Sequence, residues 1–370
     1  MRVLQVLPAL ESGGVERGTV EFAAELVRQG HESLVLSAGG PLVELLHRQG
    51  SRHITMPVHR KSLASFGQIR PVRQLLKELQ PDIVHVRSRM PAWIVRLAWK
   101  GLPADQRPAL VSTFHGMYSI NPYSAIMAKA DHIIAVSECV RDYVLNHYPV
   151  DPAKLTVIQR GVDVDAFSGP TPDPQWQQRF FQTYPHLVGK QLILMPGRIS
   201  RWKGQLLFLD VIADLVRRDS RFHGVIVGGP EAGKQRFMRE LETHCTELGL
   251  DSDISFLGQR SDIAELYRIA TLVCHMSTKP EPFGRTVTEA LAAGTPVVAF
   301  DRGGAAETLK ACFPDGLVPP DDLRSFAERA MALAQRTSHS IQLPERFRLS
   351  AQTSTTIAIY QQLLASQRGR

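Results

Sequence analysis

The sequence predicts an α/β protein with two domains, each built around a parallel sheet. At 370 residues the chain is long for a single hydrophobic core. In both halves, short apolar runs alternate with amphipathic segments, which is typical of strands and helices in a doubly wound sheet. A proline-rich stretch over residues 161–189 interrupts this alternation. We therefore place the first domain at residues 1–165 and the second at residues 166–348.

Each short apolar run bounded by turn residues is predicted to be a buried strand. In the first domain these strands are expected at residues 3–7, 33–37, 83–86, 110–114 and 132–136. The amphipathic segments between them predict helices at residues 15–29, 41–49 and 69–79. A parallel sheet of this kind binds ligands beyond the carboxyl ends of its strands, so candidate site residues are expected in the loops that follow them.

The same alternation resumes after the proline-rich stretch. Strands are expected there at residues 192–195, 224–227, 254–256, 272–275 and 297–300. Helices are expected at residues 204–217, 235–248, 262–270 and, at the end of the chain, 349–366. The second domain is therefore predicted to repeat the architecture of the first.

Composition and charge restrict the class of protein. With 44% apolar and 21% charged residues, the chain has the composition of a soluble globular protein. No apolar run has the length of a signal peptide or a membrane span, and the four cysteines are far apart, so we expect a cytoplasmic protein with reduced thiols and no metal site. The formal charge of +7 favours an anionic partner such as a nucleotide, an anionic lipid or nucleic acid.

Two glutamates eight positions apart give the strongest chemical signal. Glu281 precedes a helix predicted over residues 286–293, and Glu289 lies inside it, with Pro282 suited to the helix entry. The unpaired N–H groups of a first helical turn attract anions or ligand hydroxyls, so a carboxylate on each side suits a sugar nucleotide. Alternatively, the macrodipole alone favours acidic residues at this position. The first-turn N–H groups are those of Phe283, Gly284 and Arg285.

Glycine-rich turns follow one predicted strand in each domain. Gly13-Gly14 precedes a helix, where two glycines let the backbone approach a phosphate, although a tight turn explains them equally well. Residues 228–235 nearly match a P-loop, but Gln235 stands where Ser or Thr would hold Mg²⁺. We therefore favour a turn that lines a nucleotide cleft, including Gly228, over an ATPase site.

Basic side chains also follow predicted strands. Arg198 and Lys203 lie in the loop after the first strand of the second domain, where a guanidinium fork and a mobile ammonium suit a diphosphate. His115, followed by Gly116, ends a strand of the first domain and is a site candidate for the same positional reason. The alternatives are a solvated basic loop and a structural histidine.

Residues 87–100, together with residues 59–61, combine basic and aromatic side chains at helical spacing. This pattern suits an anionic membrane surface or an anionic acceptor. An ordinary amphipathic helix with Trp93 in the core also explains it, and both interpretations stay open. Nucleic-acid binding is not expected, because the basic residues are dispersed and no recognition helix or aromatic sheet motif is present.

Together these segments resemble the retaining glycosyltransferases of family four, which have the GT-B fold. The spacing of Glu281 and Glu289 around a Glu-x-Phe-Gly sequence is the most specific mark, and the turn at residues 161–163 agrees in position. The resemblance covers essentially the whole chain. It implies two Rossmann-like domains with parallel sheets facing a cleft, and a final segment, residues 349–370, that returns to the first domain. Arg160 stands where the family often has Asn, and its contact with ligand is left open.

The resemblance also implies substrates and roles. The donor would be a nucleotide-diphosphate sugar held mainly by the second domain, the acceptor a glycan or glycolipid held by the first, and no metal or other cofactor would be needed. The residues implied in catalysis are His115, Arg198, Lys203 and Glu281. The residues implied in donor binding are Gly13, Gly14, Gly228, Arg260, Phe283, Gly284, Arg285 and Glu289.

The implied function is retaining sugar transfer in the synthesis of a bacterial surface polysaccharide, with the lipopolysaccharide core as the favoured product. We expect a cytoplasmic protein that contacts the anionic inner face of the membrane peripherally. Two alternatives stay open: a sugar-nucleotide epimerase of the same fold, and a nucleotide-binding module without catalytic activity.

Overall fold

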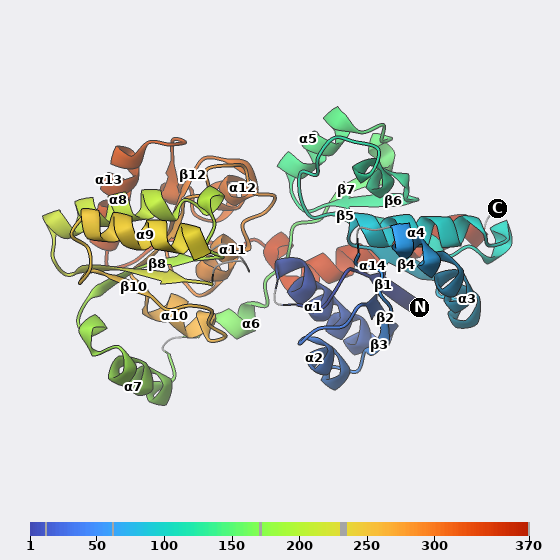
Figure 1. Cartoon of the computed structure of the whole chain (residues 1–370), viewed down its shortest axis with the longest axis horizontal. Coiled ribbons are helices and arrows are strands. Elements are labelled where there is room, and N and C mark those ends of the chain that lie inside the picture. The colour runs from blue at the N-terminus through green and yellow to red at the C-terminus, as the bar shows by residue number, and fades with distance from the viewer. Residues whose placement is uncertain (12, 61–62, 170–171, 230–234, 369–370) are drawn as a thin grey trace. The chain divides into compact units, whose positions relative to one another are not determined.

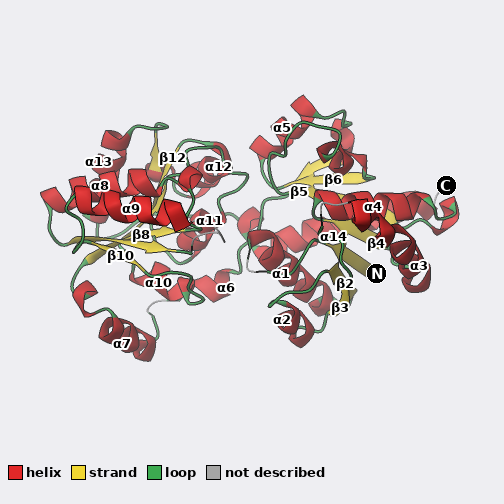
Figure 2. Cartoon of the chain, viewed as in Figure 1, coloured by secondary structure: helices red, strands yellow, loops and turns green. Residues whose placement is uncertain are grey.

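A computed structural model describes the chain except residues 12, 61–62, 170–171, 230–234 and 369–370. The described residues form two compact units, which we call unit 1 (Met1–Gly161 with Leu349–Arg370) and unit 2 (Val162–Arg348). In each unit, helices cover both faces of a parallel sheet (Figures 1 and 2). The boundary at Gly161 lies four residues before the one placed at residue 165 from the sequence.

Unit 1 contains a seven-stranded parallel sheet with the order β3-β2-β1-β4-β5-β6-β7. Its strands are β1 (Arg2–Val6), β2 (Glu32–Ser37), β3 (Arg52–Thr55), β4 (Ile83–Val86), β5 (Ala109–Phe114), β6 (His132–Ala135) and β7 (Leu155–Val157). Its α-helices are α1 (Gly14–Arg28), α2 (Val43–Arg48), α3 (Ile69–Leu79), α4 (Arg89–Lys100), α5 (Glu138–His147) and α14 (Leu349–Arg368).

Helix α14 packs against the core of unit 1. On α14, Tyr360 is fully buried, and its ring meets the Phe22 ring of α1 edge-on at 6.2 Å. Its hydroxyl lies 2.6 Å from Nδ1 of His85 in β4. Ile357 of the same helix joins the apolar cluster of the central strands. Burial of this apolar surface holds residues 349–368 on unit 1, although the residues that precede them in sequence form unit 2.

Unit 2 contains a six-stranded parallel sheet with the order β10-β9-β8-β11-β12-β13. Its strands are β8 (Gln191–Pro196), β9 (Phe222–Val227), β10 (Ile254–Phe256), β11 (Leu272–His275), β12 (Val297–Phe300) and β13 (Leu317–Val318). Its α-helices are α6 (Val164–Phe167), α7 (Pro174–Thr183), α8 (Gln205–Arg218), α9 (Gln235–Glu247), α10 (Ile263–Ile269), α11 (Arg285–Ala292), α12 (Gly303–Cys312) and α13 (Leu323–Ala334).

The two units share one topology. In unit 2, α8 packs with α9 and α13, and α11 packs with α10 and α12 (Figure 1). In both sheets the strand order reverses beside the first strand, so β1 lies next to β4 and β8 next to β11. The loops after such paired strands lie at the switch point where ligands of open α/β sheets bind.

The ten strands expected from the sequence are confirmed, with ends that differ by at most two residues from those expected. Three further strands, β3, β7 and β13, were not expected. All three lie at the edge of a sheet, and β3 and β7 are only partly buried. Edge strands face solvent on one side, so they lack the continuous apolar run that identifies a buried strand. The interrupting stretch expected at residues 161–189 contains the helices α6 and α7.

Candidate active site

Two turns at the carboxyl end of the unit 2 sheet pack directly against each other. Gly228 follows β9 with φ +147°, and a Cβ there would lie 1.9 Å from the carbonyl oxygen of Gly197, which follows β8. Only glycine permits this approach of backbone to backbone. Gly228 is therefore required by the packing of the turn, and its contact with a donor stays a prediction.

Lys203 reaches from the loop after β8 to the loop after β11. It ends a short 3₁₀ helix, Arg201–Lys203, and is followed by Gly204 at φ +85°. A Cβ on Gly204 would lie 2.1 Å from the carbonyl oxygen of Met276, so the two loops are in contact. Nζ of Lys203 donates a hydrogen bond to Oε1 of Glu281, and the two side chains are 18% and 8% exposed. Two residues that the sequence predicted separately therefore form one largely buried ion pair.

Two further side chains from the end of β11 surround the Glu281 carboxylate. The Ser277 hydroxyl donates to Oε1, and Nε2 of His275 lies 3.5 Å from the same oxygen. Burial raises the pKa of Glu281, but His275, Lys203 and Ser277 outweigh it and lower this pKa to about 2. Burial lowers the pKa of His275, and Lys203 is the cation that donates a hydrogen bond to the Glu281 carboxylate.

The start of α12 supports the backbone of Glu281. The N–H of Gly304 donates to the carbonyl oxygen of Glu281 over 2.8 Å. A Cβ on Gly303 would lie 2.6 Å from that oxygen, and one on Gly304 would lie 2.4 Å from the Pro282 carbonyl oxygen. These two glycines leave no gap between the helix and the loop. They therefore fix the position of the Glu281 backbone, from which the side chain extends.

The Glu289 side chain, in α11, is held by its own set of polar partners. Gly284 begins α11 at φ +78°, and Glu289 is 6% exposed on its buried side. Nε of Arg285 lies 2.6 Å from Oε1 of Glu289, and the Tyr267 hydroxyl donates to Oε2 over 3.2 Å. Phe283, at the entry to the helix, is buried, and its ring centroid lies 6.4 Å from that of Phe347. Both glutamates are thus buried among polar partners, and a ligand would share or replace these contacts.

Two predicted residues of unit 2 have other partners. Arg198 is exposed, and its carbonyl oxygen accepts a hydrogen bond of 3.0 Å from Nε2 of Gln205. Arg260 forms a two-pronged ion pair with Asp262 at 2.9 and 2.6 Å, and the Trp176 indole donates to the same carboxylate. This pair ties the loop after β10 to α7. Donor contacts of Arg198 and Arg260 stay predictions.

A second group of site residues lies at the carboxyl end of the unit 1 sheet. His115 follows β5 and shares a small cavity with Arg87, which follows β4, and with Arg160. Both ring nitrogens of His115 are buried without a hydrogen-bond partner. Nη2 of Arg160 donates to the carbonyl oxygen of Gly14 in the first turn of α1, whose N-cap is Gly13. The structure thus brings His115 and the glycine turn to the same end of the sheet.

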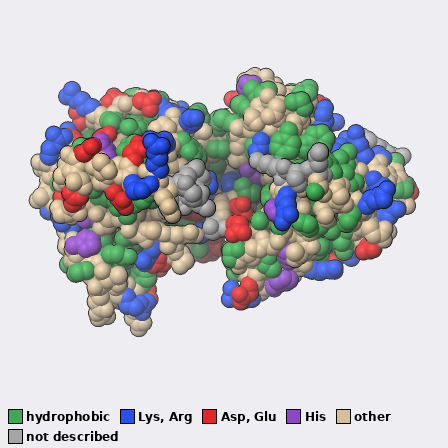
Figure 3. Space-filling model, in the orientation of Figure 1, with side chains coloured by type: hydrophobic (Ala, Val, Ile, Leu, Met, Phe, Trp, Pro, Cys, Tyr) green, Lys and Arg blue, Asp and Glu red, His purple; other side chains and the backbone are tan. Residues whose placement is uncertain are grey.

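The proposed basic and aromatic surface of residues 87–100 is partly wrong. Arg87 is 5% exposed and belongs to the cavity of unit 1. Trp93 and Trp99 are half-buried, and their indoles donate to the carbonyl oxygens of Tyr123 and Pro108. Figure 3 shows Lys and Arg side chains interspersed with acidic ones on the visible face of both units. No helix of the described residues is long and apolar enough to cross a membrane, and peripheral membrane contact stays a prediction.

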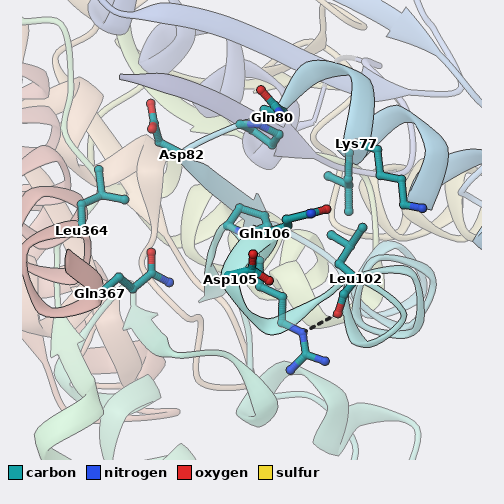
Figure 4. A pocket seen from close by; sticks show the side chains of 12 residues that line it. Lys77, Gln80, Asp82, Leu102, Asp105, Gln106, Leu364 and Gln367 are labelled. Carbon is teal, nitrogen blue, oxygen red and sulfur yellow. Dashed lines mark hydrogen bonds between the residues drawn. The ribbon is translucent and has the colours of Figure 1, made fainter. Parts of the chain in front are cut away.

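A hollow of about 410 Å³ lies at the opposite, amino-terminal end of the unit 1 sheet (Figure 4). Lys77, Asp82, Asp105 and Gln106 line it, together with Gln367 from the end of α14. Its charges are of both signs, and none of the sequence-predicted site residues lines it. Ligands of open parallel sheets bind beyond the other end of the strands, so we assign this hollow no role.

Sequence reasoning missed three side chains of the site. His275 ends β11 just as His115 follows β5, so the positional argument applied to His115 could have found it. Ser277 and Tyr267 carry no local signal, because each acts through a carboxylate that only the fold brings near. No group of three or more His, Cys, Asp or Glu side chains suited to a metal ion occurs within the described part of the chain.

Profiles of known protein families match most of the chain. Residues 12–166 match the profile of Glycosyltransferase Family 4, and residues 177–352 match that of Glycosyl transferases group 1. A D-inositol 3-phosphate glycosyltransferase of Corynebacterium kroppenstedtii is 30% identical over 60% of this chain and 49% of its own length. The lipopolysaccharide core biosynthesis mannosyltransferase LpcC of Rhizobium leguminosarum is 30% identical over 58% of this chain and 61% of its own. The matched segments thus span about half to three-fifths of these curated relatives.

Solved structures extend the match to full length. A glycosyltransferase from Rickettsia africae superposes with a TM-score of 0.81 at 31% identity, covering 98% of both chains. Anabaena HepE, solved in complex with UDP-glucose, superposes with a TM-score of 0.79 at 22% identity over the full length of both chains, and shows the fold alone. The two parallel-sheet units agree with these matches. The chain belongs to the family-four glycosyltransferases of the GT-B fold.

Proposed function

We propose that this chain is a retaining glycosyltransferase that moves a sugar from a nucleotide-diphosphate sugar to a glycan or glycolipid. The buried ion pair of Lys203 and Glu281 beside the first turn of α11 is the observation that carries this proposal. It puts a cation, an ionised carboxylate and backbone N–H donors within one polar site of unit 2. A donor with hydroxyls on its sugar and negative charge on its diphosphate matches each of these groups.

Stabilisation of the leaving group is the main catalytic task in this proposal. Cleavage of the bond between the anomeric carbon and the phosphate oxygen leaves negative charge on the nucleoside diphosphate. Lys203, helped by Arg198, would neutralise that charge, and the N–H groups at the start of α11 would donate to oxygen atoms of the donor. A fixed ammonium and fixed dipoles can perform this role without a metal ion.

The two glutamates would hold opposite ends of the donor. Glu281 stays ionised at neutral pH and can accept hydrogen bonds from sugar hydroxyls. Glu289, set between Arg285 and Tyr267, would accept from the ribose hydroxyls. Gly13, Gly14 and His115 belong to unit 1. We assign the two glycines to the donor phosphates and His115 to the reacting face of the sugar, beside the acceptor, which unit 1 would hold.

Retention of configuration fits a same-face substitution. The acceptor hydroxyl oxygen forms the new bond to the anomeric carbon while the bond to the phosphate oxygen breaks. The hydroxyl proton passes to the departing phosphate. Glu281 is a poor nucleophile for a two-step route, because Oε1 already accepts hydrogen bonds from Lys203 and Ser277.

Surface-glycan synthesis is the biological setting that we propose. The Rhizobium relative acts, by its name, in lipopolysaccharide core biosynthesis, and the Corynebacterium relative on D-inositol 3-phosphate. Both names describe transfer of a sugar to a hydroxyl-rich acceptor. A lipopolysaccharide core precursor is therefore the first acceptor to test.

One experiment separates this proposal from its alternatives. UDP-, GDP- and ADP-sugars are screened by thermal shift, since a ligand that binds only the folded state raises its stability. The best donor is then incubated with and without core oligosaccharide, using wild type and Glu281→Ala. Transfer that needs acceptor, and that falls far more in the variant than nucleotide affinity does, supports the proposal. Conversion of the donor without acceptor indicates an epimerase, and binding without consumption indicates a regulatory module.

A further inference from the structure

Arg87 is a buried cation without an acidic partner. Its side chain follows β4 at the carboxyl end of the unit 1 sheet and is 5% exposed. Within the described residues it forms no ion pair, and its Nε is buried without a hydrogen-bond acceptor. Its guanidinium carbon lies 5.4 Å from the centroid of the Phe22 ring, which gives it an aromatic wall and no counter-charge.

The groups around Arg87 are themselves cationic or neutral. Arg160 and His115 line the same cavity, and both nitrogens of the His115 ring are unpartnered. His85 forms the floor, where Thr113 and Tyr360 hold its two ring nitrogens at 2.6 Å each. Gly18 of α1 forms part of the wall, and a Cβ there would lie 2.5 Å from Nη2 of Arg160.

The pKa shifts of Arg87 and His115 agree with this set of cationic and neutral neighbours. Burial lowers the pKa of Arg87 to about 10, so its guanidinium remains charged at neutral pH. Burial lowers the pKa of His115 well below its ordinary value, and the neighbouring Arg160 and Arg87 lower it further. The cavity therefore carries the positive charge of Arg87, and no carboxylate is among the described residues that line it.

A charge kept in such a place is costly unless something pairs with it. Proteins pair buried cations with carboxylates, and this chain supplies none there among its described residues. The free volume of the cavity is about 20 Å³. A water needs about 10–15 Å³ of such volume, so the enclosed space admits about one oxygen-sized group and excludes a sugar ring. The missing partner is thus the charged tip of a larger molecule.

We propose that the cavity formed by Arg87, His115 and Arg160 binds a phosphate or carboxylate group of the acceptor. This inference rests on the proposed function for the identity of the molecule, since unit 1 is there assigned to the acceptor. It adds the chemical class of the acceptor: the acceptor is anionic, and Arg87 binds its charged group. A guanidinium fork suits either group, because both present two oxygens in one plane.

Inorganic phosphate is the first probe, and it needs no knowledge of the acceptor. Thermal stability is measured with phosphate or chloride at equal ionic strength, in wild type, Arg87→Gln and the control Arg107→Gln. Arg107 belongs to the same unit but lies at its other end, where it donates to the carbonyl oxygens of Leu102 and Lys100. We expect phosphate to stabilise wild type and the control, and to lose that effect in Arg87→Gln.

The variant has an unusual second signature. Removing a buried, unpaired charge relieves a desolvation cost, so Arg87→Gln without ligand should melt at or above the wild-type temperature. Phosphate binding should be weaker by about 30-fold or more, the loss typical of a buried charge pair. A lower melting temperature together with undiminished phosphate binding would show that Arg87 is a structural cation.

Two further measurements keep the test decisive. In wild type, imidazole NMR should show that phosphate, and not chloride, raises the pKa of His115; an unchanged pKa counts against the proposal even if the variant does not fold. Titration with the nucleoside diphosphate distinguishes the sources of the anion. An affinity equal in wild type and Arg87→Gln supports an acceptor site, whereas a loss as large as that for phosphate assigns the cavity to the donor.

Failure of the proposed function is a separate result. If no sugar nucleotide is consumed, yet phosphate still binds through Arg87, the anion site stands and the acceptor assignment falls. If transfer occurs but Arg87→Gln uses neutral and phosphorylated acceptors with unchanged KM, the anion site falls and the transferase stands.

Discussion

Lys203 and Glu281 are 78 positions apart in the sequence, yet their side chains form an ion pair with 18% and 8% exposure. They meet because β8 and β11 are neighbours in the sheet and each residue lies in the loop after one of these strands. Both charges are largely shielded from water, so each depends on the other for its stability. The pair therefore joins the fold of unit 2 to its proposed chemistry.

Stability and catalysis can be separated at this pair. Lys203→Met leaves the Glu281 charge buried without its ammonium partner, so we expect a loss of about 3–5 kcal/mol in the free energy of unfolding. Turnover should fall by about 10²–10³-fold, because a fixed cation at the leaving group is lost. The double variant Lys203→Met/Glu281→Gln should regain most of the stability and none of the turnover. Denaturant unfolding and initial transfer rates measure the two quantities.

Lys190→Met serves as the control for that series. Lys190 is also in unit 2, but it lies 3.6 Å from Asp253 in a more exposed pair. It should cost at most about 1 kcal/mol and leave turnover unchanged. Full transfer activity in the double variant would show that Lys203 acts only by pairing with Glu281.

The stability of the protein should carry an acid-side signature of Glu281. Its pKa is about 2 in the fold, against about 4.3 in an unfolded chain. The unfolded state therefore takes up the proton first as pH falls, and the stabilisation present above about pH 4.3 is lost on the way to about pH 2. Urea unfolding between pH 3 and 6 should show a shallower pH dependence for Glu281→Gln than for wild type. Parallel curves would contradict the lowered pKa.

Glu289 should determine the preference for ribose. Its carboxylate is oriented by Arg285 and Tyr267, and hydrogen bonds to charged groups contribute about 1.5–3 kcal/mol. Wild type should bind the nucleoside diphosphate about 10- to 150-fold more tightly than its 2′,3′-dideoxy analogue. Glu289→Gln should abolish most of this difference in affinity between the two ligands, as measured by calorimetric titration. A ratio unchanged by the substitution would remove Glu289 from the ribose site.

The support that α12 gives to Glu281 can be tested with one methyl group. Gly303→Ala adds a Cβ 2.6 Å from the Glu281 carbonyl oxygen, at φ +64°. Gly249→Ala is the matched control, since Gly249 has φ +70° and nothing within 4 Å of its Cβ. Both variants carry the backbone strain, but only Gly303→Ala should displace the Glu281 loop and lower kcat. Equal kcat in the two variants would mean that the loop adjusts freely.

Chelation should not reduce transfer. In the proposed chemistry Lys203 and the first turn of α11 meet the leaving charge, so donor turnover should be the same with EDTA as with added Mg²⁺ or Mn²⁺. Initial rates after dialysis against chelator measure this. Loss of turnover that added metal restores would overturn the metal-free part of the proposal.

Much of this architecture could be predicted because its signals are local. The ten expected strands, of which all but β10 are largely buried, appear as short apolar runs, and the start of α11 shows in the order of Glu281, Pro282 and Gly284. The identity of the site loops followed from one rule, that they come after the strands of a parallel sheet. Periodicity and turn chemistry carry this information within a few residues.

The amino-acid sequence by itself thus determined the α/β class, the doubled topology and the two glutamates at a helix entry. Only the tertiary structure decided which side chains meet: Lys203 with Glu281, Arg260 with Asp262, and Arg87 with the inside of a cavity instead of a surface. The physical reason is one of range. Segment patterns report average burial along the chain, whereas pairing of charges depends on the order and register of strands that long-range packing brings together.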